Sequence, residues 1–184
     1  GLALAPENVR KLDGVEPMMA KTADYLAASQ RKDGRFAGAI FDEGAPQNYC
    51  TSLAVSALAR FDREKYQPAI AKAAAWIRAQ QCNEAAGYDR EKHPVAYGGF
   101  GYGSSLRPDL SNTWIALAAL KAAGVEADDP TVKAAMVFVK RCQNSSEVND
   151  QKELAGEDGG AMYLPGETFG IDSSDPNGKK LFTS

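Results

Sequence analysis

The stretch Asp109-Leu-Ser-Asn-Thr-Trp-Ile-Ala-Leu-Ala-Ala-Leu-Lys-Ala-Ala-Gly124, continued through Gln143, decides the fold because the chain contains an earlier copy of it. A constant offset of 62 positions relates the two copies. One unbroken offset indicates an internal repeat, and therefore stacked supersecondary units. The matched residues are Thr51 with Thr113, Ala54 with Ala116, Ala57 with Ala119, Leu58 with Leu120, Pro68 with Pro130, Trp76 with Phe138 and Gln81 with Gln143.

A third, partial copy lies upstream at an offset of 51 positions. Its apolar residues follow the i, i+3, i+4, i+7 spacing of an amphipathic helix, with charged residues turned elsewhere. The repeat therefore includes a helix of this kind at least three times. The upstream copy pairs Met19, Thr22, Ala23, Tyr25, Leu26 and Gln30 with Ile70, Ala73, Ala74, Trp76, Ile77 and Gln81.

The periodicity predicts an all-α fold with five helices in the order outer, inner, outer, inner, outer. One-sided apolar patterns predict the outer helices at 17–30, 68–81 and 130–143. The stretches 49–60 and 109–123 are apolar or small almost all the way round, which a helix tolerates when protein surrounds it. In the last outer helix the pattern predicts four buried side chains, namely Val132, Ala135, Met136 and Val139.

Two regions follow from this pattern: an N-terminal arm at 1–16, without clear periodicity, and a repeat domain at 17–184. By the repeat logic an inner helix is expected after the last Gly-rich link, near Ser184, so we expect an incomplete ring. An array open at that edge leaves the apolar flank from Val132 to Val139 uncovered, which predicts that the chain self-associates or is marginally stable.

The composition excludes some classes of function. An apolar fraction of 44% is ample for a core, and a net charge of −3 without a basic patch argues against nucleic acid as a partner. The longest apolar runs fall far short of the roughly 20 residues of a transmembrane helix. Residue 1 is Gly and no signal-like segment follows, so we expect a processed or partial chain and assign no compartment.

Toward the end of each outer helix an aromatic residue is followed, five positions later, by a Gln. A Gly-rich turn that carries another large side chain comes next. This pattern resembles the Gln-Trp repeat of squalene-hopene and oxidosqualene cyclases, within the prenyltransferase and squalene oxidase repeat family. The resemblance covers about residues 17–163. The three instances are Tyr25 to Gln30 with Phe36, Trp76 to Gln81 with Phe100, and Phe138 to Gln143 with Met162 and Tyr163.

The resemblance implies an α/α toroid, in which inner helices line an axial cavity and outer helices surround them. The amide of a Gln at a helix end has donors and acceptors for the carbonyls of its own helix and for the backbone of a neighbour. We therefore interpret Gln30, Gln81 and Gln143 as structural residues of the repeat rather than as catalysts.

Catalytic groups of the resembled enzymes are not found. The cyclases protonate their substrate with an Asp-x-Asp-Asp motif, and the nearest string, Glu126-Ala-Asp-Asp129, departs at its first position. Asp129 before Pro130 instead predicts a helix cap. Zinc-dependent prenyltransferases use Asp, Cys and His, but the single histidine, His93, has no second ligand at metal spacing. We therefore predict no metal and no cofactor, and assign no catalytic residue.

The three cysteines, Cys50, Cys82 and Cys142, show no C-x-x-C spacing. We predict small buried side chains near helix ends. The alternative is a disulfide between Cys82 and Cys142, which lie at corresponding positions of successive repeats.

Four residues near the starts of the inner helices are candidate ligand contacts: Tyr49, Cys50, Asn112 and Trp114. The leading hypothesis is an isoprenoid or lipid-like ligand in an apolar cavity. One alternative is a non-enzymatic scaffold that binds a protein partner through loop residues Tyr97, Phe100 and Tyr102. Another is a terpene cyclase or prenyltransferase whose catalytic residues lie beyond Ser184.

Overall fold

The computed structural model describes residues 6–36, 46–103, 107–153 and 155–166. Over these ranges the chain is helical, with isolated antiparallel bridges in place of extended strands. The all-α fold class is therefore confirmed. No described helix combines the length and the apolar character that crossing a membrane requires.

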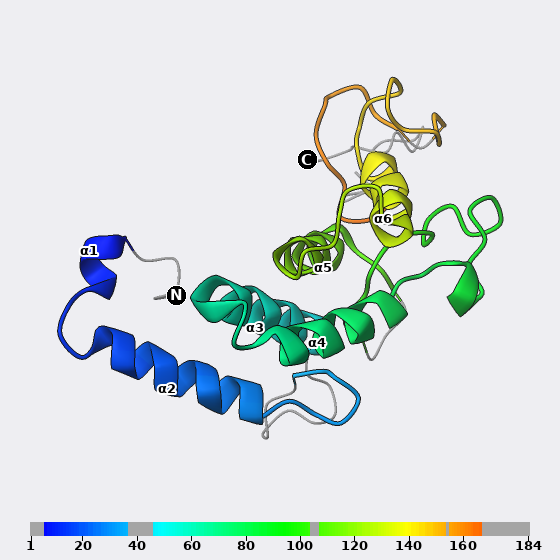
Figure 1. The fold of residues 1–184 in the computed structure, drawn as a ribbon. Coiled ribbons are helices and arrows are strands. Elements are labelled where there is room, and N and C mark those ends of the chain that lie inside the picture. The colour runs from blue at the N-terminus through cyan, green and yellow to red at the C-terminus, as the bar shows by residue number, and fades with distance from the viewer. Residues whose placement is uncertain (1–5, 37–45, 104–106, 154, 167–184) are drawn as a thin grey trace. The chain divides into compact units, whose positions relative to one another are not determined.

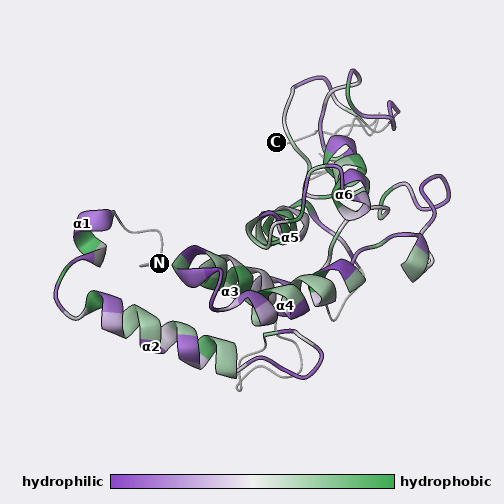
Figure 2. Ribbon diagram, viewed as in Figure 1, coloured by the Kyte–Doolittle hydropathy of each residue, from purple (hydrophilic) through white to green (hydrophobic). Residues whose placement is uncertain are grey.

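All five predicted helices are present, and each boundary lies within two residues of its predicted position. The outer helices are α2 (Val15–Ala28), α4 (Gln67–Ala79) and α6 (Pro130–Arg141), and the inner helices are α3 (Gln47–Asp62) and α5 (Leu110–Ala122). Figure 2 shows hydrophilic and hydrophobic residues alternating along α2 and α6, as expected for outer helices.

The described part of the predicted N-terminal arm contains a short helix, α1 (Glu7–Arg10), and α2 begins at Val15. The helix α1 packs against α2, so the described part of the arm contributes to the helical array. A four-residue helix is too short to leave a periodic apolar pattern in the sequence.

The described residues form two compact units. The first contains residues 6–36, 46–80, 102–103 and 115–126, and the second contains 81–101, 107–114 and the described residues from 127 onward. Within the first, α3 packs against both α2 and α4 (Figure 1). The apolar residues of α4 that match the upstream copy with i, i+3, i+4, i+7 spacing, Ile70, Ala73, Ala74 and Ile77, are all buried, as that spacing predicts.

The predicted buried face of α6 is wrong at three of its four positions. Ala135 is buried, but Met136 is 41% exposed and Val132 and Val139 are only half-buried. The segment that follows α4 covers another side of α6: a Cβ added to Gly99 would lie 2.7 Å from the Phe138 ring. A loop distant in sequence therefore selects the side that is buried, namely Thr131, Ala135, Phe138 and Arg141.

Candidate functional site

The two glutamines that lie just after the ends of α2 and α4 make equivalent hydrogen bonds. Gln30 Nε2 donates to the carbonyl of Gly34 in its own turn (2.8 Å) and to that of Ala69 (2.9 Å). Gln81 Nε2 donates to the carbonyls of Gly98 (3.0 Å) and Thr131 (2.8 Å). Ala69 and Thr131 are 62 positions apart and lie in the first turns of α4 and α6. Each amide thus ties one Gly-rich turn to the next outer helix.

A glycine in each of these turns allows the helix to approach. Gly34 and Gly98 have left-handed backbones, with φ of 102° and 85°. A Cβ at Gly34 would lie 2.5 Å from the carbonyl oxygen of Lys72, and one at Gly98 would lie 1.9 Å from that of Ala134. Both distances are far inside van der Waals contact, so only glycine fits.

The phenylalanine two residues after each glycine is bonded through its backbone to an inner helix. The backbone N–H of Phe36 donates to Thr51 Oγ1, and that of Phe100 donates to Thr113 Oγ1, each at 3.0 Å. Both phenyl rings are buried. The repeated threonines therefore anchor the Gly-rich turns to the starts of α3 and α5.

The turn after Gln143 has the same backbone hydrogen bonds as the turn after Gln81. It lacks the glutamine side-chain bond to an outer helix among the described residues. The Asn144 N–H donates to the Gly160 carbonyl and the Gly159 N–H to the Asn144 carbonyl, as Cys82 does with Gly99 and Gly98 in the preceding turn. Gln143, however, is exposed, and its side chain makes no hydrogen bond to any described residue. Among the described residues, Gln30 and Gln81 make side-chain bonds to a following outer helix, and the structural role of all three glutamines stays a prediction.

The four ligand candidates fall in two groups. In the first unit Tyr49 and Cys50 are half-buried, and the Tyr49 ring stacks on Tyr102 with centroids 6.1 Å apart. In the second unit Asn112 is fully buried, and its side-chain Nδ2 donates to Asp109 Oδ2 across 2.8 Å. Trp114 is 65% exposed. Burial and the bond to Asp109 favour a packing role for Asn112, whereas the Trp114 ring is accessible.

The three loop candidates also differ in exposure. Phe100 is fully buried, and Tyr97 is 8% exposed with its hydroxyl donating to Glu84 Oε1 across 2.8 Å. Burial is the main reason why the pKa of Tyr97 is raised, so this phenol stays protonated. Tyr102 is 39% exposed. Only one of the three rings is open to a partner.

The acidic and histidine candidates have structural roles in the described residues. Asp129 accepts a hydrogen bond from the Thr131 N–H across 2.9 Å, which confirms the predicted cap of α6. His93 Nδ1 accepts from the Asp89 N–H at 2.9 Å and packs edge-on against Tyr88. Among the described residues no three His, Cys, Asp or Glu side chains are grouped as metal ligands.

The cysteines are thiols. The alternative of a Cys82–Cys142 disulfide is not borne out, although both side chains are buried as predicted, while Cys50 is half-buried. Burial raises the pKa of the Cys82 thiol to about 11, and that of Cys142 is raised further for the same reason. Neither buried thiol is a ready nucleophile at neutral pH.

An ion pair that the sequence did not predict holds the end of α6. Arg141 is 2% exposed, and its Nε and Nη2 donate to the two carboxylate oxygens of Asp150 at 2.6 and 2.9 Å. Its Nη1 donates to the carbonyls of Arg90 and Pro94. The Arg141 guanidinium holds the pKa of Asp150 well below its usual range. The sequence repeat gave no indication of this ion pair, because the position in α4 that is equivalent to Arg141 is occupied by Ala79.

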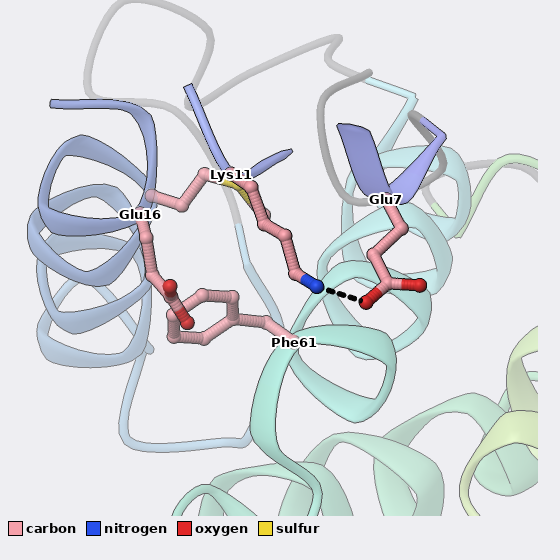
Figure 3. Close-up of a pocket in the computed structure, with 5 residues that line it drawn as sticks. Glu7, Lys11, Glu16 and Phe61 are labelled. Carbon is pink, nitrogen blue, oxygen red and sulfur yellow. Dashed lines mark ion pairs between the residues drawn. The ribbon is translucent and has the colours of Figure 1, made fainter. Parts of the chain in front are cut away.

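Two hollows are lined in part by charged side chains. One, of about 400 Å³, lies between the Gln81 turn and the first turns of α6, and Glu84, Arg90 and Lys133 are among its lining residues. The other, of about 230 Å³, lies in the first unit, where Figure 3 shows Lys11 extending toward Glu7. That ion pair is about 70% exposed and stabilises little. Neither hollow is the apolar cavity that the sequence suggested.

The repeat geometry and the comparisons with known proteins agree. The family model of the squalene-hopene cyclase C-terminal domain matches residues 7–157. The chain therefore belongs to the squalene-hopene cyclase C-terminal domain family, and its helices are of the α/α toroid type that the resemblance implied. Neither the curated proteins nor the solved structures contain a match.

Proposed function

We propose that an exposed apolar strip on the inner helix α3, in the first unit, binds an isoprenoid or another lipid-like ligand. The observation that carries the proposal is that α3 exposes a large apolar side chain, Leu53, which is 54% exposed. The inner helices otherwise bury small and apolar residues, including Ala54, Val55 and Ala116.

In the first unit these apolar groups form a strip. Tyr49 and Leu53 are four residues apart on α3 and therefore share one face of the helix. Tyr102 extends the strip, because its ring stacks on Tyr49. A strip of one aliphatic and two aromatic side chains matches the chemistry of a branched, unsaturated hydrocarbon chain.

Membership of the squalene-hopene cyclase family supports the same ligand class, since the name of that family describes proteins that act on squalene. The scaffold alternative has less support. Of its three loop rings, Tyr97 and Phe100 are buried, so a protein partner would contact Tyr102 alone. Catalysis is not part of the proposal, because the nearest string to the Asp-x-Asp-Asp motif, Glu126 to Asp129, departs from it at the first position.

Tryptophan fluorescence tests the proposal. The chain has two tryptophans, Trp76 and Trp114, so Trp114→Phe leaves Trp76, in the first unit, as the reporter. Trp76 is half-buried and lies beside Gly103, the neighbour of Tyr102. Squalene delivered from cyclodextrin should shift the Trp76 emission to the blue in a saturable manner, because a ligand on the strip shields the indole from water. Cyclodextrin alone serves as the blank. A Trp76 spectrum that does not respond to squalene or to a longer polyprene would refute the proposal.

A matched pair of variants locates the site. Leu53→Ser in the same background should weaken binding about tenfold, the effect of losing one apolar contact. Met136→Ser changes an apolar side chain of similar exposure on the outer helix α6, and should leave binding unchanged. Equal effects of the two substitutions would indicate nonspecific adsorption to apolar surface.

A further inference from the structure

The hollow of about 400 Å³ in the second unit lies between one face of α6 and the loop that follows α4. Its volume lies within the range of about 300 to 1,000 Å³ that is typical of small-molecule sites. The lining residues from α6 have i, i+3, i+4, i+7 spacing and therefore share one face of the helix. They are Pro130, Lys133, Ala134 and Val137. We call this feature the α6 hollow.

The opposite wall of the α6 hollow includes the side chain of Tyr97. This residue is 8% exposed, and its hydroxyl donates to Glu84 Oε1 across 2.8 Å. Burial and the Glu84 carboxylate raise the pKa of Tyr97, and the charges of Arg90 and Arg141 partly oppose that effect. The two guanidinium groups therefore lie near the Tyr97 hydroxyl. Glu84 and Arg90 line the hollow together with Tyr97.

Buried side chains fix both walls of the α6 hollow. Gln81 is 1% exposed and donates to the Thr131 carbonyl on the helix side and to the Gly98 carbonyl on the loop side. Arg141 is 2% exposed, and its Nη1 donates to the carbonyl of Arg90 at 3.1 Å. A site with walls that are already fixed loses little conformational freedom when a ligand binds.

The charged groups around the α6 hollow do not balance. One carboxylate, that of Asp150, accepts from two guanidinium groups, namely Nε and Nη2 of Arg141 and, at 3.1 Å, Nη2 of Arg90. Lys133 adds a third cation and Glu84 a second carboxylate. Three cations thus accompany two carboxylates in this group of described side chains, which leaves one positive charge in excess. Electrostatic complementarity therefore favours a ligand with one negative charge.

The α6 hollow also has an apolar part, which lies beside the cations. Ala134 and Val137 are half-buried, and both line the hollow with the buried Tyr97. Lys133 and Val137 are four residues apart and are therefore neighbours on the helix surface. An anionic group at Lys133 would place the apolar part of the same molecule over Val137.

We propose that the α6 hollow binds a small carboxylic acid with an apolar group, such as an aromatic or branched-chain acid. The carboxylate lies between Lys133 and Arg90, and the apolar group lies on Ala134 and Val137. A carboxylate matches the single excess charge, whereas a phosphate dianion exceeds it. The site belongs to the second unit and is independent of the strip proposed for a lipid-like ligand in the first.

The test is a titration of the ¹⁵N-labelled full chain with benzoate at constant pH and ionic strength, followed through the backbone amide signals. Saturable shifts should be confined to residues 83–97 and 130–137, around the hollow. The dissociation constant should be about 1 mM, as expected for so small a ligand. Shifts that are absent, or that spread evenly over the chain, would overturn the proposal.

Two further probes separate the parts of the ligand. Benzamide has the same ring without the charge and should bind at least about tenfold more weakly than benzoate. Equal binding of the two would show that the cations take no part and would contradict the proposal. Phenyl phosphate carries the same ring on a phosphate group. If it bound more tightly than benzoate, the choice of a carboxylate would be wrong.

A pair of lysine variants locates the anionic group. Lys133→Met keeps the aliphatic stem without the charge and should weaken benzoate binding about fivefold, the upper effect of an exposed ion pair. Lys121→Met removes the same charge from an exposed position on α5 and should leave binding unchanged. Far-UV circular dichroism on heating verifies that both variants fold. Equal weakening by both would indicate a response to net charge alone, and binding that neither weakens would place the benzoate elsewhere; either result contradicts the proposed site.

Discussion

The side-chain amide of Gln81 donates a hydrogen bond to the backbone carbonyl of Thr131, 50 residues further along the chain, across 2.8 Å. Gln81 is 1% exposed and also donates to the Gly98 carbonyl at 3.0 Å. One buried side chain, from a residue just after α4, thus bonds both to the Gly-rich turn that follows and to the start of α6. Its equivalents Gln30 and Gln143 are progressively more exposed, which allows a graded test.

We expect Gln81→Ala to lower the free energy of unfolding by about 2 to 3 kcal/mol, because two buried carbonyls lose their donor. Gln30→Ala should cost about 1 kcal/mol, since Gln30 is only half-buried. Gln143→Ala should change stability by less than about 0.5 kcal/mol under conditions where the chain is monomeric. Urea unfolding followed by circular dichroism measures all three. Equal losses would show that the amides do not act through these bonds.

We expect Gly98→Ala to destabilise the fold by at least about 3 kcal/mol, because the new Cβ would lie 1.9 Å from the backbone oxygen of Ala134. Gly87→Ala has the same backbone strain without the clash, and should cost about 1 kcal/mol. The difference between the two unfolding free energies isolates the steric contact. A similar cost for both substitutions would mean that α6 can move away from the turn.

The Arg141–Asp150 ion pair predicts sensitivity to acid. Because Arg141 lowers the pKa of folded Asp150 below its ordinary value of 3.8, the pair stabilises the fold above that pH and less as the pH falls below it. Asp150→Asn should lower stability at neutral pH by about 2 kcal/mol, because the buried Arg141 loses its counter-charge. It should also flatten the decline in stability between about pH 5 and pH 2.

The matched control is Glu153→Gln, an exposed carboxylate three residues away. It should leave both the neutral stability and the acid decline unchanged, as surface substitutions usually do. Urea unfolding at each pH provides the comparison. A variant Asp150→Asn that keeps the acid decline of the unsubstituted protein would show that another carboxylate governs it.

The three cysteines should differ in reactivity. Cys50 is half-buried, whereas Cys82 and Cys142 are buried with raised thiol pKa values. In the folded chain at about pH 8 a thiol reagent should therefore modify Cys50 first, since the thiolate is the reactive form. All three should react rapidly in denaturant. Mass spectrometry of digested samples identifies the sites, and early modification of Cys142 would contradict the burial described here.

Much of the fold follows from local patterns. The constant offset of 62 positions located α3 to α6, and the face of α4 formed by Ile70 and Ile77 was predicted because its neighbours in sequence cover it. The cap at Asp129 followed from two adjacent residues. Short-range periodicity and capping are set by helix geometry, which is the same wherever the helix lies.

The candidate site was less predictable. Asn112 and Trp114 sit two residues apart near the start of one helix, yet the first is buried against Asp109 and the second is exposed. A helix that is apolar on all sides leaves no pattern to show which side meets solvent. The pairing of Arg141 with Asp150 was equally invisible, because a loop outside the repeat pattern supplies the carboxylate.

The sequence by itself determined that this protein is an array of alternating inner and outer helices, because a repeated helical pattern can be satisfied only by stacking similar units. The tertiary structure alone decided which of the three glutamines bond to an outer helix among the described residues, since Gln30, Gln81 and Gln143 all precede equivalent turns. A hydrogen bond needs its acceptor within about 3 Å. Whether an acceptor is there depends on which helix packs against the turn.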